Sequence, residues 1–223
     1  MTMLTVNAQT LTERQKGLAA CACLMAQGDM DRLEPAVRMA LDKGVTINEL
    51  KEAFSQLYAY TGFPRSLNAL GVLNKVLEAS PRGGFEGGWQ EGKPWKRPAE
   101  WDDAKKAYEL GTKNQTQLSG KPFNYTFCPQ DDYYLKSHLF GDIFAGDQLS
   151  AADREIVTVA ALSGLEGAAP QLAAHKQGAV NMGNSKQLVD ELCAWLSGEG
   201  YTLSTKWPKG EPNPYGKYFI GQS

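Results

Sequence analysis

An imidazole and a carboxylate that could move a proton lie on two neighbouring segments in the second half of the chain. Ser150 and Asp153 form a helix N-cap with an acidic first turn, so Glu155 lies near the start of an Ala-rich helix. After a break at 164–170, His175 lies on or beside the apolar face of the next helix. A histidine exchanges protons near neutral pH, and a carboxylate orients it and raises its basicity. We therefore predict that His175 and Glu155 meet as a proton-transfer pair.

A structural interpretation of the same residues stays open. A single histidine on an apolar helix face is more often a hydrogen-bonded core residue than a catalyst. Glu155 follows Arg154 in the first turn of its helix, where a negative charge is favoured by the helix dipole alone. The other histidine, His138, precedes Phe140-Gly, and we expect it to be structural.

The segment that carries the pair has a partner earlier in the chain, which indicates an internal repeat. Both copies have a capping hydroxyl, an apolar helix, a second helix that ends at a glycine, and a second capping hydroxyl. In this alignment Glu155 corresponds to Gly17 and His175 corresponds to Ala36, so the first copy lacks both polar groups. The aligned pairs include Leu11 with Leu149, Thr12 with Ser150, Leu18 with Ile156, Ala22 with Ala160, Leu33 with Leu172, Gly44 with Gly183 and Thr46 with Ser185.

Strand signals are almost absent, so the pattern predicts an all-α protein built from two tandem helical repeats. Capping boxes begin two of the expected helices, at Thr12 with Gln15 and at Thr46 with Glu49. Further helices are expected over 30–43, 63–79, 102–117 and 133–144. We divide the chain into repeat 1 (10–80), a Gly-, Pro- and Trp-rich connection (81–102), repeat 2 (103–199) and a Pro-rich C-terminal arm (200–223).

Two motifs resemble a known family. A Gln56-x3-Tyr60-x-Gly62-x-Pro64-x3-Asn-Ala run follows the third helix start, and Phe140-Gly-Asp-Ile-Phe precedes Leu149-Ser. Together they resemble the carboxymuconolactone decarboxylase family, which includes the alkylhydroperoxidase D-like proteins. The resemblance covers roughly 11–78 and 103–197, and it implies an all-α fold and a homo-oligomer, in which three two-repeat chains rebuild a six-unit ring.

The resemblance also implies a reaction. The family decarboxylase acts without metal or organic cofactor on a lactone acid whose carbonyl accepts the electrons released with carbon dioxide. We therefore expect a cofactor-independent lyase acting on a small carboxylated substrate, with His175 as the acid and Glu155 beside it. Arg65, Arg154 or Lys176 is expected to bind the substrate carboxylates.

A shared pocket is a sharper form of this hypothesis. Copy two would supply His175 and Glu155, while copy one would supply Arg65 and the hydroxyls of Tyr58 and Tyr60. The simpler interpretation of both tyrosines is that they are core or rim aromatics.

Two alternatives remain. A peroxidase of the alkylhydroperoxidase D type needs a Cys-x-x-Cys pair between the glutamate and the histidine, and the segment from Glu155 to His175 contains no cysteine. The residues therefore argue against that activity. Because the first copy lacks both polar groups, a non-catalytic scaffold or small-ligand binder is the other alternative.

Composition sets the remaining limits. Twenty-five acidic and twenty-three basic residues leave the chain near neutral, without the basic run that a nucleic-acid partner would need, and no apolar stretch approaches membrane-spanning length. Val6-x-Ala8 resembles the residues before a signal-peptidase cut, but a charged start and a full apolar core are missing. We expect a cytoplasmic protein, or an exported, periplasmic one if the true start lies upstream of Met1. The spacing of Cys21, Cys23, Cys128 and Cys193 does not match a metal site, and disulfide pairing among them stays open.

The connection contains Trp89, Trp95 and, at its end, Trp101. Three tryptophans so close together favour one of two roles. They line or cover a ligand site, or they pin the connection as a strap across the hydrophobic surface of the helices.

Overall fold

The computed structural model describes residues 10–80 and 88–203, and its regular structure there is entirely helical. The predicted signal-like start and most of the C-terminal arm lie outside the described residues. None of the described helices is both long enough and apolar enough to cross a membrane. The elements are α1 (Glu13–Gln27), α2 (Met30–Asp42), α3 (Ile47–Thr61), α4 (Phe63–Ala79), the 3-10 turn η1 (Ala99–Asp102), α5 (Ala104–Ser119), α6 (Pro129–Tyr134), the π-helix η2 (Leu135–Ile143), α7 (Ala151–Ser163), α8 (Ala169–Asn181) and α9 (Lys186–Gly198).

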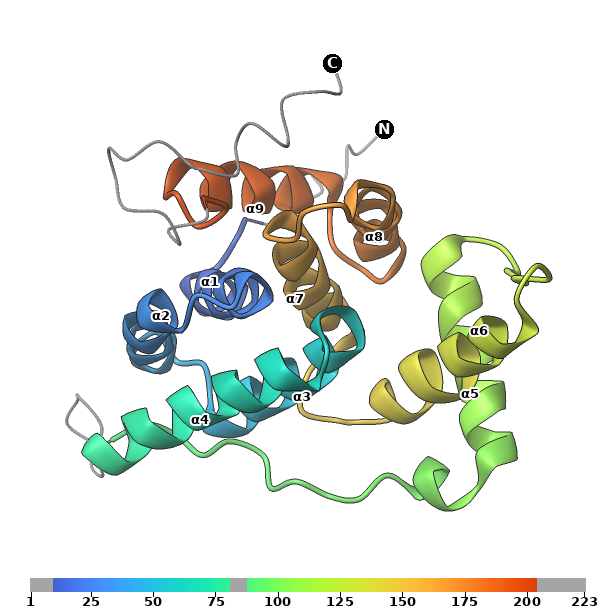
Figure 1. Ribbon diagram of the computed structural model, residues 1–223, viewed down its shortest axis with the longest axis horizontal. Coiled ribbons are helices and arrows are strands. Elements are labelled where there is room, and N and C mark those ends of the chain that lie inside the picture. Colours follow the sequence, from blue (N-terminus) through green and yellow to red (C-terminus); the bar gives the residue numbers. More distant parts are fainter. Residues whose placement is uncertain (1–9, 81–87, 204–223) are drawn as a thin grey trace, which may run out of the picture.

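Two central helices, α1 and α7, pack against each other, and α2, α3, α4, α8 and α9 pack around them (Figure 1). Every residue from Gly17 to Gln27 in α1 and from Arg154 to Leu162 in α7 is buried. Both segments are rich in alanine and other small or apolar residues, and a helix that is apolar on all sides is stable only when it is enclosed. This enclosure places Glu155, which lies in the buried part of α7, deep inside the protein.

The expected helix starts are present in both copies. Thr12 and Ser150 cap α1 and α7, Thr46 and Ser185 cap α3 and α9, and each side chain accepts a hydrogen bond from a backbone N–H in the first turn. Gly44 and Gly183, aligned in the repeat, both have positive φ values, 86° and 114°. The helices α1 to α3 and the helices α7 to α9 thus begin and turn at equivalent residues. The domain boundaries drawn from the sequence stay a prediction.

Breaking one capping box is expected to cost a modest, measurable amount of stability. Thr46→Ala removes the hydroxyl that accepts from the Glu49 N–H, so the free energy of unfolding should fall by about 1 kcal/mol. Thr116→Ala, in the middle of α5, is the matched control because it removes a threonine from a helix interior and should leave stability unchanged or slightly higher. Urea denaturation of both variants measures the difference, and equal midpoints would contradict the capping role.

The connection runs along α3 as a strap. The backbone N–H groups of Ile47 and Asn48 donate to the carbonyls of Gln90 and Glu91, at 3.0 Å each. Trp89 packs against the main core and its indole N–H donates to Asp42. The strap interpretation is therefore correct at Trp89, while further along the connection the other two tryptophans line a cavity.

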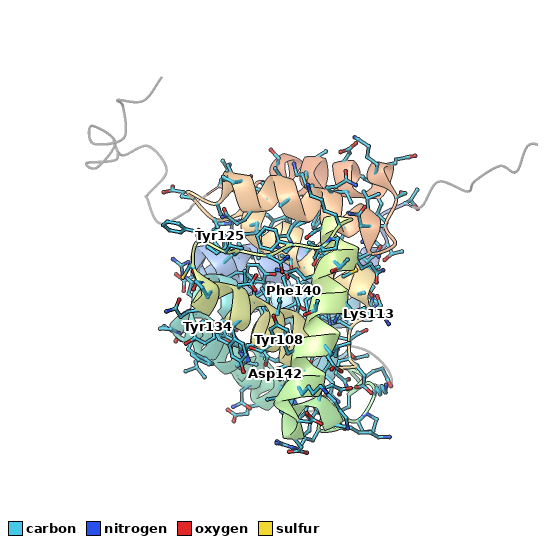
Figure 2. All side chains as sticks on the ribbon, turned by 90° about the vertical axis from the view of Figure 1, so that its right-hand side faces the viewer. Tyr108, Lys113, Tyr125, Tyr134, Phe140 and Asp142 are labelled. Atoms are coloured by element: carbon cyan, nitrogen blue, oxygen red, sulfur yellow. The ribbon has the colours of Figure 1, made fainter. Side chains whose placement is uncertain are left out.

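Helix α5 pairs with α6 and η2 to form a hairpin beside the central helices (Figure 1), and Figure 2 looks onto it, with Tyr108 from one arm and Tyr134 and Phe140 from the other. A small second core of Leu118, Leu139, Phe140 and Met182 joins the hairpin to α8. The predicted helix over 133–144 begins earlier, at Pro129, and changes from α to π geometry at Leu135. Sequence periodicity does not distinguish these two geometries over so short a segment.

Candidate functional site

Glu155 and His175 meet in the protein interior. The Glu155 side chain is fully buried in α7, and the His175 side chain, in α8, is 10% exposed. The imidazole Nδ1 lies 2.8 Å from Glu155 Oε2. Because a carboxylate only accepts hydrogen bonds, the neutral histidine carries its proton on Nδ1 and presents the Nε2 lone pair. The contact with Glu155 therefore fixes the tautomer of the neutral imidazole and leaves Nε2 free of the carboxylate.

Tyr60, at the end of α3, lies against this dyad. Its ring packs edge-to-face on the imidazole of His175, with ring centroids 5.5 Å apart. Burial, and then the negative charge of Glu155, raise the pKa of the Tyr60 hydroxyl, so the group stays protonated and able to donate. The first copy thus contributes a polar side chain to the histidine and glutamate of the second.

Two buried polar atoms beside His175 have no hydrogen-bond partner among the described residues. They are the second carboxylate oxygen of Glu155 and the hydroxyl of Tyr60, which lies near the Thr158 hydroxyl, a group already bonded to Gln56 and to the Arg154 carbonyl. Leaving a buried polar atom unpaired costs free energy, and such atoms in a folded protein usually meet a ligand, an ion or a water. The Glu155 oxygen is therefore an acceptor, and the Tyr60 hydroxyl a donor, that a small ligand beside His175 could bind.

Arg154 is buried and forms hydrogen bonds and an ion pair within the protein. Its guanidinium is 1% exposed, donates to Gln56 Oε1 at 2.9 Å and to the Gly146 carbonyl at 2.7 Å, and pairs with the carboxylate of Glu52. The ring of Phe144 lies 5.5 Å from its charged carbon. These contacts tie α7 to α3 and to the end of η2, which is a positioning role within the protein.

The other predicted binding residues, Arg65 and Tyr58, make no hydrogen bond with the dyad of His175 and Glu155. Arg65, near the start of α4, is half-buried and makes no ion pair or hydrogen bond with another described residue. Tyr58 lies two residues before Tyr60 on α3 and is bonded to His138 Nε2 instead of facing His175. Side chains two apart on a helix point in different directions, so α3 places one tyrosine against each of two histidines: Tyr58 bonds His138, and the ring of Tyr60 packs on His175.

The sequence analysis gave His138 a structural role, and the structure places it on the wall of a cavity of about 560 Å³. Its Nδ1 lies 2.8 Å from Asp142 Oδ2, four residues later. The spacing of His138 and Asp142 was visible in the sequence, as a histidine and a carboxylate one helical turn apart. Tyr58 could not be added to them without the tertiary structure, because it is eighty positions away.

The cysteines do not form a thiol site. All four are free, and Cys21 and Cys23 are completely buried in α1. Burial raises the pKa of both thiols, to about 11 for Cys23, which disfavours the nucleophilic thiolate. Together with the cysteine-free segment from Glu155 to His175, these positions argue against the peroxidase alternative.

Comparison of the sequence with models of known protein families identifies the family of this chain. The model of the carboxymuconolactone decarboxylase family matches residues 1–75 and 133–202, which include most of repeat 1, the larger part of repeat 2 and more than half of the chain. Comparison with curated protein sequences gives no significant match. The match agrees with the all-helical fold and with the two motifs at Tyr60 and Phe140. The chain belongs to the carboxymuconolactone decarboxylase family.

Proposed function

We propose that the protein is a cofactor-independent lyase that decarboxylates a small lactone or keto acid, with His175 and Glu155 as its proton-transfer pair. The single observation that carries the proposal is the buried 2.8 Å contact between His175 Nδ1 and Glu155 Oε2, with an unpaired Glu155 oxygen and an unpaired Tyr60 hydroxyl beside it. Family membership supports the reaction class, and the absence of cysteine between the pair separates it from thiol chemistry.

The reaction assigns one task to each group. The bond between the substrate carboxylate and its ring or chain carbon breaks, carbon dioxide leaves, and the electron pair moves into the adjacent carbonyl to give an enolate. Protonated His175, whose charge Glu155 balances, delivers the Nε2 proton to the enolate carbon and is reprotonated from water. The Tyr60 hydroxyl donates to the enolate oxygen as charge develops there.

A cation is needed to hold the substrate's carboxylates. Arg154 is buried and paired with Glu52, whereas Arg65 is half-buried and unpaired among the described residues. Among the predicted cations this difference leaves Arg65 available to a carboxylate, which a guanidinium recognises through two parallel hydrogen bonds, although no contact joins Arg65 to His175 or Glu155 within the described residues.

A panel of lactone and keto acids, followed by carbon dioxide release in deuterated water, tests the proposal. We expect at least one acid to be decarboxylated faster than in buffer, with one deuterium at the carbon that lost the carboxylate. His175→Gln should lower the accelerated rate by about 100-fold to 10,000-fold, while Glu109→Gln, a surface glutamate of α5, should leave it unchanged. An inactive wild-type chain across the panel, or full activity in His175→Gln, would exclude the proposed function.

A further inference from the structure

A second group of polar side chains lies in a cavity that the dyad of His175 and Glu155 does not use. The cavity, of about 560 Å³, lies between α3, α4, η2 and the connection. Its volume is in the range of pockets that hold small molecules. Phe63, Leu67, Leu70, Trp95 and Trp101 form most of its apolar lining.

Three of the polar side chains on the wall, Tyr58, His138 and Asp142, form a hydrogen-bonded chain. Asp142 accepts from Nδ1 of His138 at 2.8 Å, which leaves the Nε2 lone pair to accept a hydrogen bond from the Tyr58 hydroxyl. The Tyr58 ring stacks on Phe63 with centroids 4.1 Å apart and planes 7° apart, so the phenol is held in place. The order of groups, carboxylate, imidazole, hydroxyl, is the order that activates a hydroxyl for proton transfer.

These groups are accessible, unlike the buried dyad. The side chains of His138 and Asp142 are 46% and 33% exposed, and both line the cavity together with Tyr58. Both lie on the π-helix η2, a geometry that occurs mostly in short stretches and often at functional sites. Asp142, labelled on the η2 arm of the hairpin in Figure 2, accepts through its backbone carbonyl from the indole N–H of Trp101 at 2.9 Å. The aromatic wall is thus tied to the polar chain.

The charges in the cavity select the kind of ligand. The carboxylate of Glu52 is paired with Arg154, and that of Asp142 with His138. Lys51 is the remaining charged lining residue in the described part of the chain. The aromatic surfaces of Trp95 and Trp101, with ring centroids 5.8 Å apart, favour a flat apolar molecule over a multiply charged acid.

We propose that this cavity is a second site, which binds an uncharged aromatic molecule with an acidic hydroxyl and removes its proton through Tyr58, His138 and Asp142. The ligand O–H bond breaks and its proton passes to the Tyr58 oxygen, while the Tyr58 proton passes to His138 Nε2. The products are a bound phenolate and an imidazolium that Asp142 balances. The proposal is independent of the lyase, because it uses none of that site's residues.

The experiment uses the full chain with two probes, 4-nitrophenol and 4-nitroanisole, which differ by the acidic proton. Both should bind saturably and quench tryptophan fluorescence. Bound 4-nitrophenol should show the phenolate absorption band at a pH where the free probe is mostly neutral. Trp95→Ala should weaken both probes by about 10-fold, because it removes an aromatic contact.

Tyr58→Phe separates the relay from simple binding. This variant should bind 4-nitroanisole as the wild type does, within about twofold, but lower the ionised fraction of bound 4-nitrophenol by about 10-fold, which is the effect of about 1.4 kcal/mol. Asp142→Asn should lower that fraction as well, because it no longer balances the imidazolium. Tyr108→Phe is the control, since this tyrosine stacks on Tyr133 outside the cavity and should leave both readouts unchanged.

Each contrary result overturns the proposal. If neither probe binds, or if Trp95→Ala leaves their binding unchanged, the cavity is not the site. Binding with an unchanged ionised fraction in both Tyr58→Phe and Asp142→Asn would show that the three side chains do not move the proton. Circular dichroism of each variant must match the wild type before its result counts.

Discussion

Glu155→Gln is expected to lower the turnover of the decarboxylated acid by about 100-fold to 10,000-fold, which is the usual contribution of a positioned acid or base. Glutamine fills the same volume in a fully buried position, so the helix packing is retained. It removes the negative charge that stabilises protonated His175 across the 2.8 Å contact. Steady-state kinetics with the acid found in the panel measure the loss.

The double variant with His175→Gln separates catalysis from structure. If the two side chains act as one unit, Glu155→Gln should cost little more once His175 is absent, because losses within a catalytic unit are not additive. A purely structural role predicts instead that the defects appear in the free energy of unfolding and leave kcat intact. Nearly full turnover in the folded Glu155→Gln variant would contradict the proposed role of the carboxylate.

Gly111→Ala is expected to lower the free energy of unfolding by about 3 kcal/mol or more. At Gly111, in α5, an added Cβ would lie 1.6 Å from the backbone carbonyl oxygen of Lys136 in η2. A backbone oxygen cannot rotate away as a flexible side chain can, so the two arms of the hairpin must separate. Gly141 shows the same closeness from the other arm, where a Cβ would lie 2.3 Å from the Ala107 carbonyl oxygen.

Gly71→Ala is the matched control for this prediction. Gly71 lies on the exposed side of α4, and a Cβ there meets nothing within 4 Å. The same substitution should therefore raise the free energy of unfolding by about 0.5 to 1 kcal/mol, because alanine is the better helix former. Urea denaturation of both variants measures the contrast. Equal stability of Gly111→Ala and wild type would show that the arms do not approach this closely.

Much of the fold follows from local sequence signals. The capping boxes at Thr12 and Thr46 begin α1 and α3 at the predicted residues. Helix α4 ends at Ala79, as its apolar spacing predicts. Helix ends with weaker signals differ from the predicted residues. Helix α5, for example, begins at Ala104 and not at 102, because Asp103 provides the N-cap. Capping and periodicity act over a few residues, and such interactions can be predicted from sequence.

Part of the candidate site was also predictable. The sequence places Glu155 and His175 on consecutive helices separated by a short turn, and the structure joins them at 2.8 Å. Their catalytic role stays a prediction, supported by the family match. Arg154 was expected to bind substrate, but its burial beside Glu52 depends on how α7 packs on α3. Sequence neighbours do not reveal such a partner.

The sequence by itself determined the helix content, the two capped copies and the pairing of His175 with Glu155, because each depends on residues close in the chain or on adjacent helices. Only the tertiary structure decided the direction of each tyrosine of α3. Tyr60 reaches the dyad, while Tyr58 is bonded to His138, eighty positions later. The close crossing of α5 and η2 sets where His138 lies, and contacts between distant segments form only when the whole chain is packed.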